Sequence, residues 1–243
     1  MSVIRTDLRS KGCSFVPGAA LRIGPEARDS AAELASEWEN LELDNYLKNG
    51  ARFRERRYGR FYYLPRTNSI RLLKHRPYFQ SKDANAYAGG IHREVAPLTD
   101  SSVKNPLMNT LIEFNFAQFP VDADDERLDQ PWEVACHQFR IIATADELGE
   151  PTPEGIHRDD IDFGAIHLMS RSNVAGGNSL VYDNSKNLIA EYCLRSRLDT
   201  LFWADHQVLH SVTPITPEDA SARGVRDILI LGYRCTFDLL ETD

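Results

Sequence analysis

Three residues of this chain have the chemistry of a metal site. His157 and Asp159 form an H-x-D pair within the run G-I-H-R-D, and His210 follows much later in the run V-L-H. Two imidazoles and one carboxylate are the donor set of the facial triad that binds non-haem ferrous iron and leaves positions open for substrate and oxygen. These residues therefore predict an oxygen-activating iron centre.

The spacing of the H-x-D pair suits an extended segment. In a strand, residues i and i+2 point to the same face, so His157 and Asp159 would both face a barrel interior. His210 lies 51 residues beyond Asp159 (210 − 159) in another strand-like run, and a jelly roll brings such distant strands together. A buried, hydrogen-bonded histidine is the ordinary alternative for an isolated H-x-D pair, but the order and the β-rich surroundings favour the metal site.

An arginine could bind a dicarboxylate co-substrate near such a centre. Arg226 precedes the apolar run I-L-I-L and lies 16 residues beyond His210 (226 − 210). A dicarboxylate that chelates iron at one end needs a cation for its far carboxylate, and the planar guanidinium can bind a carboxylate through two hydrogen bonds. Arg223 is the alternative candidate, and a surface loop position for both arginines is the competing interpretation.

Helical patterns mark the first part of the chain, with strand-like runs between them. Apolar residues recur at helical spacing after Gly24-Pro25, and Asn49-Gly50 ends that pattern. The expected elements are a helix from 24 to about 47, strand-like runs near 52–64 and 69–74, and a helix from about 106 to 118. The basic run at 52–60 is interpreted as a solvated strand face or a protected sheet edge.

Short β-rich runs, separated by turn residues, make up the chain after Pro131. They cover residues 132–144, 163–170, 179–182, 188–194, 200–203, 207–212 and 227–237. Many short strands with frequent turns favour a sandwich or barrel. We therefore expect a mainly β protein with some helix, in which residues 1–130 supply a helical cover and outer strands, residues 131–243 supply the β core, and 1–243 form a single domain.

The bulk composition limits the possible partners and compartments. The chain has 243 residues, of which 42% are hydrophobic, and a net charge of −8, which argues against a nucleic-acid partner. Cys13, Cys136, Cys193 and Cys235 are scattered without a CxxC pair, which disfavours a disulfide framework or a structural zinc site and suits a reducing compartment. No run approaches the ~20 apolar residues that span a bilayer, and no signal core is present. We expect a cytoplasmic protein that does not bind membranes.

The motifs together resemble those of a known enzyme group. The matching runs are G-I-H-R-D, I-H-L-M-S-R-S-N-V-A-G-G-N-S-L-V-Y-D, L-H-S-V-T-P-I and R-D-I-L-I-L-G-Y-R, with H-Q-F-R-I-I-A as a first core strand. They resemble the bacterial 2-oxoglutarate- and Fe(II)-dependent dioxygenases that hydroxylate free aliphatic amino acids, the L-isoleucine 4-hydroxylase group. The resemblance covers the C-terminal half well and the N-terminal half loosely. Where it leads us to expect H-x-D-G, this chain has Asp160.

The resemblance implies a fold, cofactors and an activity. It implies a double-stranded β-helix (jelly-roll) core, with iron held by His157, Asp159 and His210. It implies that 2-oxoglutarate chelates the iron through its 1-carboxylate and 2-keto oxygen, while Arg226 holds the 5-carboxylate. With O2, such an enzyme converts 2-oxoglutarate to succinate and CO2 and hydroxylates an aliphatic carbon of a small L-amino acid.

Three residues are candidates for binding the amino acid. An amino acid needs a cation for its carboxylate, and Arg93 lies in the glycine-flanked segment G-G-I-H-R-E, which could form a lid. Arg140 and Gln138 lie on the expected core strand. A structural role is the competing interpretation for each of the three.

Two other functions remain compatible with the same residues. A cupin-like metal enzyme, such as an isomerase, would work without 2-oxoglutarate and would not need Arg226 as a carboxylate clamp. A non-catalytic β-sandwich that binds or senses a ligand could retain the three metal ligands. Turnover-dependent succinate formation would separate that binding protein from either enzyme.

Overall fold

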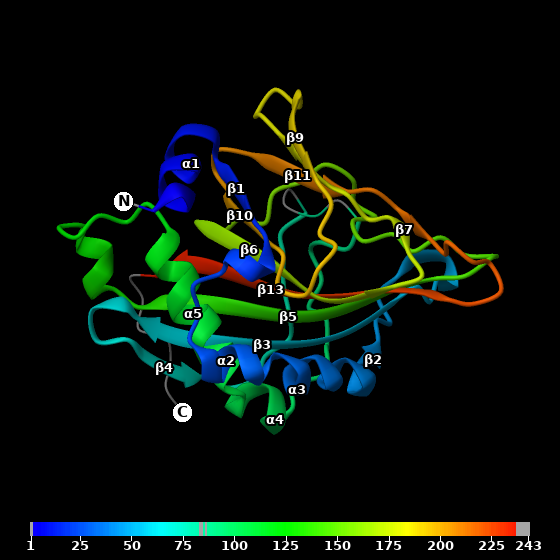
Figure 1. The fold of residues 1–243 in the computed structure, drawn as a ribbon, viewed down its shortest axis with the longest axis horizontal. Coiled ribbons are helices and arrows are strands. Elements are labelled where there is room, and N and C mark those ends of the chain that lie inside the picture. Colours follow the sequence, from blue (N-terminus) through cyan, green and yellow to red (C-terminus); the bar gives the residue numbers. More distant parts are fainter. Residues whose placement is uncertain (1, 83–84, 86, 237–243) are drawn as a thin grey trace.

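The structure, a computed structural model, describes residues 2–82, 85 and 87–236. An antiparallel sheet of eight strands runs through the middle of the molecule (Figure 1). Its strands are β1 (Cys13–Val16), β2 (Glu42–Leu43), β3 (Arg54–Leu64), β4 (Ser69–Leu72), β5 (Trp132–Ala143), β6 (Phe163–Ser172), β10 (Thr200–Ala204) and β13 (Gly224–Cys235). They pair in the order β1-β10-β6-β13-β5-β3-β2, and β4 also pairs with β3. Strands from both halves of the chain thus share one sheet.

Two smaller antiparallel sheets complete the β core. Their strands are β7 (Ala175–Gly176), β8 (Ser179–Tyr182), β9 (Leu188–Tyr192), β11 (Leu209–Val212) and β12 (Ile215–Thr216). Three of these strands form a sheet in the order β11-β8-β9, and β12 pairs with β7. Residues of β8 and β11 enclose a common interior with residues of the large sheet. Antiparallel sheets that face each other in this way form the expected jelly-roll core, so that prediction is confirmed.

Helices cover the other face of the large sheet (Figure 1). The α-helices are α1 (Val3–Lys11), α2 (Pro25–Asp29), α3 (Ala31–Ser36), α4 (Asp100–Lys104) and α5 (Pro106–Gln118), and the 3-10 helices are η1 (Gly18–Ala20), η2 (Glu37–Asn40), η3 (Lys48–Gly50), η4 (Pro65–Thr67) and η5 (Glu126–Asp129). The α5 prediction is confirmed, because Asn105 caps the helix by accepting from the Leu107 N–H and Pro106 occupies the first turn. Within the described ranges, no helix is long and apolar enough to cross a membrane.

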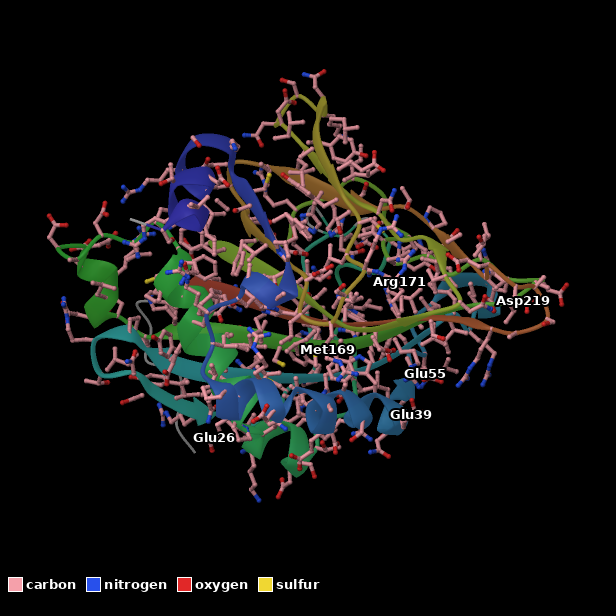
Figure 2. All side chains as sticks on the ribbon, viewed as in Figure 1. Glu26, Glu39, Glu55, Met169, Arg171 and Asp219 are labelled. Carbon is pink, nitrogen blue, oxygen red and sulfur yellow. The ribbon has the colours of Figure 1, made fainter. Side chains whose placement is uncertain are left out.

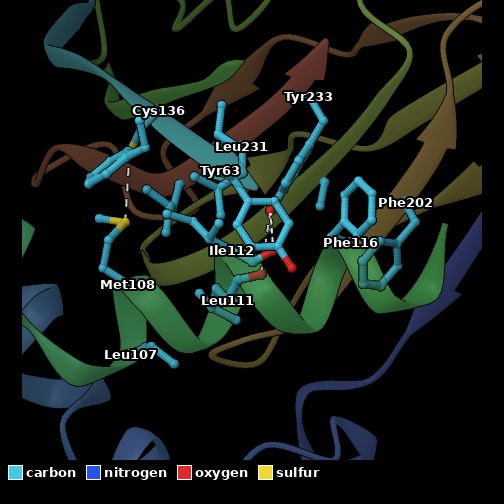
Figure 3. Packing of buried hydrophobic residues seen from close by; sticks show 14 of the residues in the cluster. Tyr63, Leu107, Met108, Leu111, Ile112, Phe116, Cys136, Phe202, Leu231 and Tyr233 are labelled. Carbon is cyan, nitrogen blue, oxygen red and sulfur yellow. Dashed lines mark hydrogen bonds between the residues drawn. The ribbon is translucent and has the colours of Figure 1, made fainter. Parts of the chain in front are cut away.

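The apolar core between α5 and the large sheet is rich in aromatic residues (Figure 3). Ile112 and Phe116 of α5 pack in the same buried cluster as Leu231 and Tyr233 of β13. The Tyr233 hydroxyl donates to the carbonyl oxygen of Ile112 at 3.0 Å, which satisfies its buried polar atom. Met169 of β6 belongs to this layer and lies inside the molecule (Figure 2). Because strand residues alternate, the neighbours of these residues on β13 face the opposite side of the sheet.

The first expected helix is shorter than its sequence pattern predicts. It is divided into α2, α3 and η2 and ends at Asn40, whereas the apolar spacing predicted a helix to about Leu47. Glu42–Leu43 pairs with β3 instead, and the Asp44 N–H donates to the Arg54 carbonyl oxygen at 2.9 Å. Sheet pairing therefore overrides the local helical preference. The elements α1, α4, β1, β7 and β12 were not predicted from the sequence.

The interpretation of the basic run at 52–60 as a solvated face or sheet edge was wrong for Arg54 and Arg56. β3 lies inside the sheet, with β5 on one side and β2 and β4 on the other. Arg54 and Arg56 are buried on the same face of β3, whereas the alternate Arg57 is partly exposed. The Asp44 carboxylate lies 2.7 Å from Arg54 Nη2 and 3.4 Å from Arg56 Nη1, so it partly neutralises the buried charge.

Candidate active site

His157, Asp159 and His210 meet in the interior between the sheets. Asp159 Oδ1 lies 3.6 Å from His157 Nε2, and Asp159 Oδ2 lies 3.4 Å from His210 Nε2. One donor atom from each residue lies within 4.8 Å of the other two. Two imidazoles and a carboxylate this close together could hold one metal ion from one side, which leaves the other coordination positions open.

The spacing predicts a strand for the H-x-D pair, but the structure places the pair in a loop. A single bridge ties this loop to β11, because the His157 and His210 backbones each donate to the other's carbonyl oxygen at 3.0 Å. The bridge brings the two imidazole rings to 4.4 Å between centroids. Asp159 contacts both rings, so the i, i+2 spacing still directs both side chains of the pair to one side.

Asp205 fixes the loop that carries Asp159. The Asp205 carboxylate is buried and accepts the Asp159 N–H at 3.1 Å to each oxygen, the Ile161 N–H at 3.3 Å and the Trp203 indole N–H at 3.2 Å. Burial, and then the nearby Asp159 carboxylate, raise the pKa of Asp205 to about 6. The sequence offers one signal for this residue, an acidic side chain directly after the apolar run L-F-W-A, and it was not predicted.

Asp159 and His210 have protonation states that suit metal binding, whereas His157 carries a proton that a metal would displace. Burial by itself would raise the pKa of Asp159, but His210 and His157 hold it well below its usual value, so the carboxylate is ionised. Burial and His157 lower the pKa of His210 to about 4. Burial opposes protonation of His157 too, but Asp159 and Glu154 outweigh it and raise its pKa to about 9, so a metal would have to displace that proton.

The Nδ1 atom of His157 already has a hydrogen-bond partner. Nδ1 of His157 lies 2.9 Å from the carbonyl oxygen of Gly155, and an N–H donated there orients the ring and leaves Nε2 for a metal. Asp160 follows the H-x-D pair with a φ of 59°. Glycine adopts this left-handed conformation freely and aspartate tolerates it, so Asp160 satisfies the backbone requirement of the H-x-D-G pattern.

Arg226 has an environment that is suited to a bound anion. It is fully buried on β13, and its Nε, Nη1 and Nη2 have no hydrogen-bond partner among the described residues. It lies two residues before Ile228 and on the same face of β13, and Ile228 lines the interior cavity. Burial and the guanidinium of Arg171 on β6 (Figure 2) lower the pKa of Arg226 to about 10, so it remains cationic at neutral pH. A buried cation without a partner is costly, so an anion such as the far carboxylate of 2-oxoglutarate fits here.

Two neighbouring features also suit a bound carboxylate. The Ser179 hydroxyl is buried in the cavity wall without a partner among the described residues. Gly177 has a φ of +71°, and a Cβ there would lie 3.1 Å from Arg226 Cδ and 3.2 Å from Arg171 Nη1, so a larger residue would crowd both arginines. Arg223, the alternative candidate, is exposed.

Arg93 lines a cavity of about 370 Å³ that also contains the candidate metal ligands. Reciprocal backbone hydrogen bonds of 2.8 Å join Tyr78 and Arg93 and close the base of the intervening loop. The Arg93 guanidinium donates to Gln80 Oε1 at 2.7 Å and lies 4.6 Å from the centre of the Tyr78 ring. The glycine-flanked segment therefore forms part of the cavity wall.

Arg140 and Gln138 point away from this cavity. Alternation along β5 places His137 in the cavity wall and Gln138 and Arg140 on the helical side of the sheet. Gln138 Nε2 donates to Ser102 Oγ at 3.0 Å, and Arg140 Nε donates to Asp227 Oδ1 at 2.8 Å. Their hydrogen bonds therefore give them structural roles, and the candidate substrate site does not include them.

Comparisons with known proteins agree with this geometry. The model of the 2OG-Fe dioxygenase family matches residues 35–232. The L-isoleucine-4-hydroxylase of Bacillus thuringiensis is 32% identical over 239 residues, which cover 97% of this chain and 94% of the relative. The 3(1)-hydroxy-L-isoleucine 4-dioxygenase of Pantoea ananatis is 28% identical over 241 residues, or 94% of each chain.

Solved structures share the fold. The crystal structure of a bsmA homolog from Methylobium petroleophilum is 30% identical, with a TM-score of 0.84 over 98% of this chain and 94% of that chain. The crystal structure of IDO from Bacillus thuringiensis has a TM-score of 0.79 at 24% identity, over 95% of this chain and 97% of that chain. At that identity, the second match supports the fold alone.

Proposed function

The chain belongs to the 2OG-Fe dioxygenase family, and on that premise we propose that it hydroxylates an aliphatic carbon of a small L-amino acid. Membership makes it an iron- and 2-oxoglutarate-dependent enzyme, and this excludes both alternatives, the cupin-like enzyme without 2-oxoglutarate and the non-catalytic binding protein. The names of two relatives that match nearly the whole chain support an amino-acid substrate.

The observation that carries this proposal is the combination of a metal-binding triad with a buried, unpaired arginine. His157, Asp159 and His210 would hold the iron, which when bound supplies the oxidising chemistry with O2. Arg226 would bind the 5-carboxylate of 2-oxoglutarate through its free N–H groups. The exposure of Arg223 supports the choice of Arg226 as that clamp.

The protein itself would position the substrates and exclude water. Asp205 would hold the Asp159 loop, and the Gly155 carbonyl would hold the His157 ring. The cavity of about 370 Å³ suits small molecules and not a polymer. Arg93 lines it and would contact the amino acid.

We also propose that residues 1–243 act as one domain, because β3 of the first part pairs along its length with β5 of the second. A cytoplasmic location is supported by the four cysteines, which form no disulfide.

A direct assay tests the proposed activity. Reactions with Fe(II), ascorbate, 2-oxoglutarate and each proteinogenic L-amino acid should show, by mass spectrometry, a gain of one oxygen for at least one amino acid and a matching yield of succinate. The Asp159→Ala variant is the control, since it removes the single carboxylate of the triad. If no free amino acid gains oxygen, whereas an N-acylated or carrier-bound one does, the free-substrate proposal is wrong.

A further inference from the structure

The cavity contains more buried positive charge than the metal centre and its co-substrate require. Arg54, Arg56 and Arg93 all line it, and each is less than a tenth exposed. Asp44 is within salt-bridge distance of Arg54 and Arg56, and no described carboxylate lies within that distance of Arg93. Two of the three guanidinium groups therefore share one close carboxylate and the third has none within that distance, in a region where unpaired charge is unfavourable.

Arg56 is held rigidly but keeps an unpartnered N–H. Its Nη2 lies 3.0 Å from Nδ1 of His137. Burial, and then the charge of Arg56, hold the pKa of His137 well below its usual value. The His137 ring is therefore neutral, and its Nδ1 accepts the hydrogen bond from Arg56. Its guanidinium carbon lies 4.6 Å from the centre of the Phe139 ring and 5.3 Å from that of Tyr78. Its Nε has no partner among the described residues. These contacts fix the guanidinium before any ligand binds.

Arg93 approaches the same aromatic ring from the glycine-flanked segment. Its guanidinium carbon lies 4.6 Å from the Tyr78 ring centre, and its Nε is also buried without a partner in the described part of the chain. Burial lowers the pKa of Arg93, and the nearby Arg54 guanidinium lowers it further. Tyr78 and Asp44 act in the opposite direction and raise this pKa. Arg56 and Arg93 thus flank Tyr78 with N–H groups still available.

This cluster lies close to the candidate metal centre. Tyr78 lines the same cavity as His157, Asp159 and His210. Tyr78 and His137 pack edge to face, with ring centres 4.6 Å apart. A molecule bound beside Tyr78 would therefore have its remaining atoms near His157 and Asp159.

We propose that Arg56 and Arg93 together bind the α-carboxylate of the amino-acid substrate and so determine that the enzyme selects free amino acids over amides and amines. The proposal rests on the function proposed above. Guanidinium groups bind a planar carboxylate through paired N–H donors, and a neutral amide would leave part of that positive charge uncompensated. Because the proposed function assigns Arg226 to 2-oxoglutarate, the substrate requires this second cationic site.

The test compares an acid with its amide in wild-type and variant enzymes. The probes are L-isoleucine and L-isoleucinamide, or the preferred amino acid from the screen and its primary amide. For wild type, we expect the amide to have a KM about 10- to 100-fold higher than the acid. Arg56→Gln and Arg93→Gln should each raise the KM for the acid by a similar factor, leave the KM for 2-oxoglutarate within about threefold, and reduce the preference for acid over amide.

A matched control and a second variant keep the result decisive. Arg71→Gln removes an exposed arginine on β4 and should leave both KM values unchanged. Arg56→Lys should restore part of the affinity for the acid, because it keeps the charge. If Arg56→Gln does not fold, Arg93→Gln gives the same comparison without disturbing the Asp44 ion pairs.

The outcomes separate this inference from the proposed function. Variants that fold and still prefer the acid by the wild-type factor would overturn the clamp, and so would a wild-type enzyme that uses the amide equally well. If wild type hydroxylates no amino acid, the proposed function fails first, and the α-carboxylate assignment fails with it. Anaerobic calorimetry of amino-acid binding, with Fe(II) and 2-oxoglutarate present, gives a readout independent of turnover.

Discussion

Replacing Arg226 with methionine should affect stability and co-substrate binding in opposite directions. Arg226 is fully buried, its three nitrogens have no partner among the described residues, and Arg171 lies opposite it on β6. Without a bound anion, the folded protein contains an uncompensated charge that unfolding would release into water. Methionine removes that charge and retains a flexible, unbranched side chain that fills much of the same space.

The two effects can be estimated separately. An unpaired buried charge costs about 3–5 kcal/mol, and the shorter side chain loses about 1–2 kcal/mol of packing, so the net gain in unfolding free energy is about 2 kcal/mol. For a chain of 243 residues, this corresponds to a rise in Tm of about 4–8 °C. Loss of the bidentate contact should weaken 2-oxoglutarate binding by about 2–4 kcal/mol, or about 30- to 1,000-fold.

Thermal unfolding and titration calorimetry test both parts. Unfolding is measured without metal or 2-oxoglutarate, and 2-oxoglutarate is then titrated anaerobically into the Fe(II)-loaded protein. Arg223→Met is the control, because Arg223 is exposed, and it should change neither quantity. A variant of Arg226 that binds 2-oxoglutarate as wild type does would refute the assignment. A loss of stability would instead show that Arg226 supports the fold directly.

Three further outcomes are expected. Asp159→Ala should abolish iron retention in metal analysis while the circular dichroism spectrum is unchanged. Asp205→Asn should weaken iron binding by about 10- to 100-fold, because an amide replaces one of the two oxygens that accept the Asp159 N–H. Burial lowers the pKa of His167 from 6.5 to about 3, so the unfolded chain binds a proton below pH 6.5 that the folded protein does not. As the pH falls from 6.5 towards 3, the unfolding free energy should therefore decrease by up to about 1.4 kcal/mol per pH unit because of this one proton. The His167→Gln variant should lack this contribution, so its unfolding free energy should decrease less steeply with falling pH.

The candidate metal site could be predicted because its chemistry is visible in short segments of sequence. The H-x-D spacing constrains His157 and Asp159 to one side even though the segment is a loop, since one bridge to His210 makes the local backbone extended. The position of Arg226 was predictable for a similar reason. It precedes a run of successive apolar residues, and such a strand is buried on both faces, so an arginine in it is expected to be buried on either face.

The rest of the site depends on which face of a strand is buried, and sequence alternation does not decide that. Arg54 and Arg56 share a face, but the surface interpretation failed because Asp44, ten residues before Arg54, folds back to neutralise them. Gln138 and Arg140 show the reverse error, since their strand was correct but their side chains face the helices. A charged residue in a strand is expected at the surface unless a partner is known, and these partners are brought together only by tertiary contacts.

The two groups of arginine differ in a way that bears on their function. Arg140 is paired with Asp227 and Glu39, and its Nε and Nη2 both donate to these carboxylates. Arg226, Arg56 and Arg93 each retain a buried, unpartnered N–H, which is unfavourable for the protein alone. Such groups are stabilised when an anion binds, so incomplete pairing together with burial beside the cavity or on β13 distinguishes Arg226, Arg56 and Arg93 from Arg140.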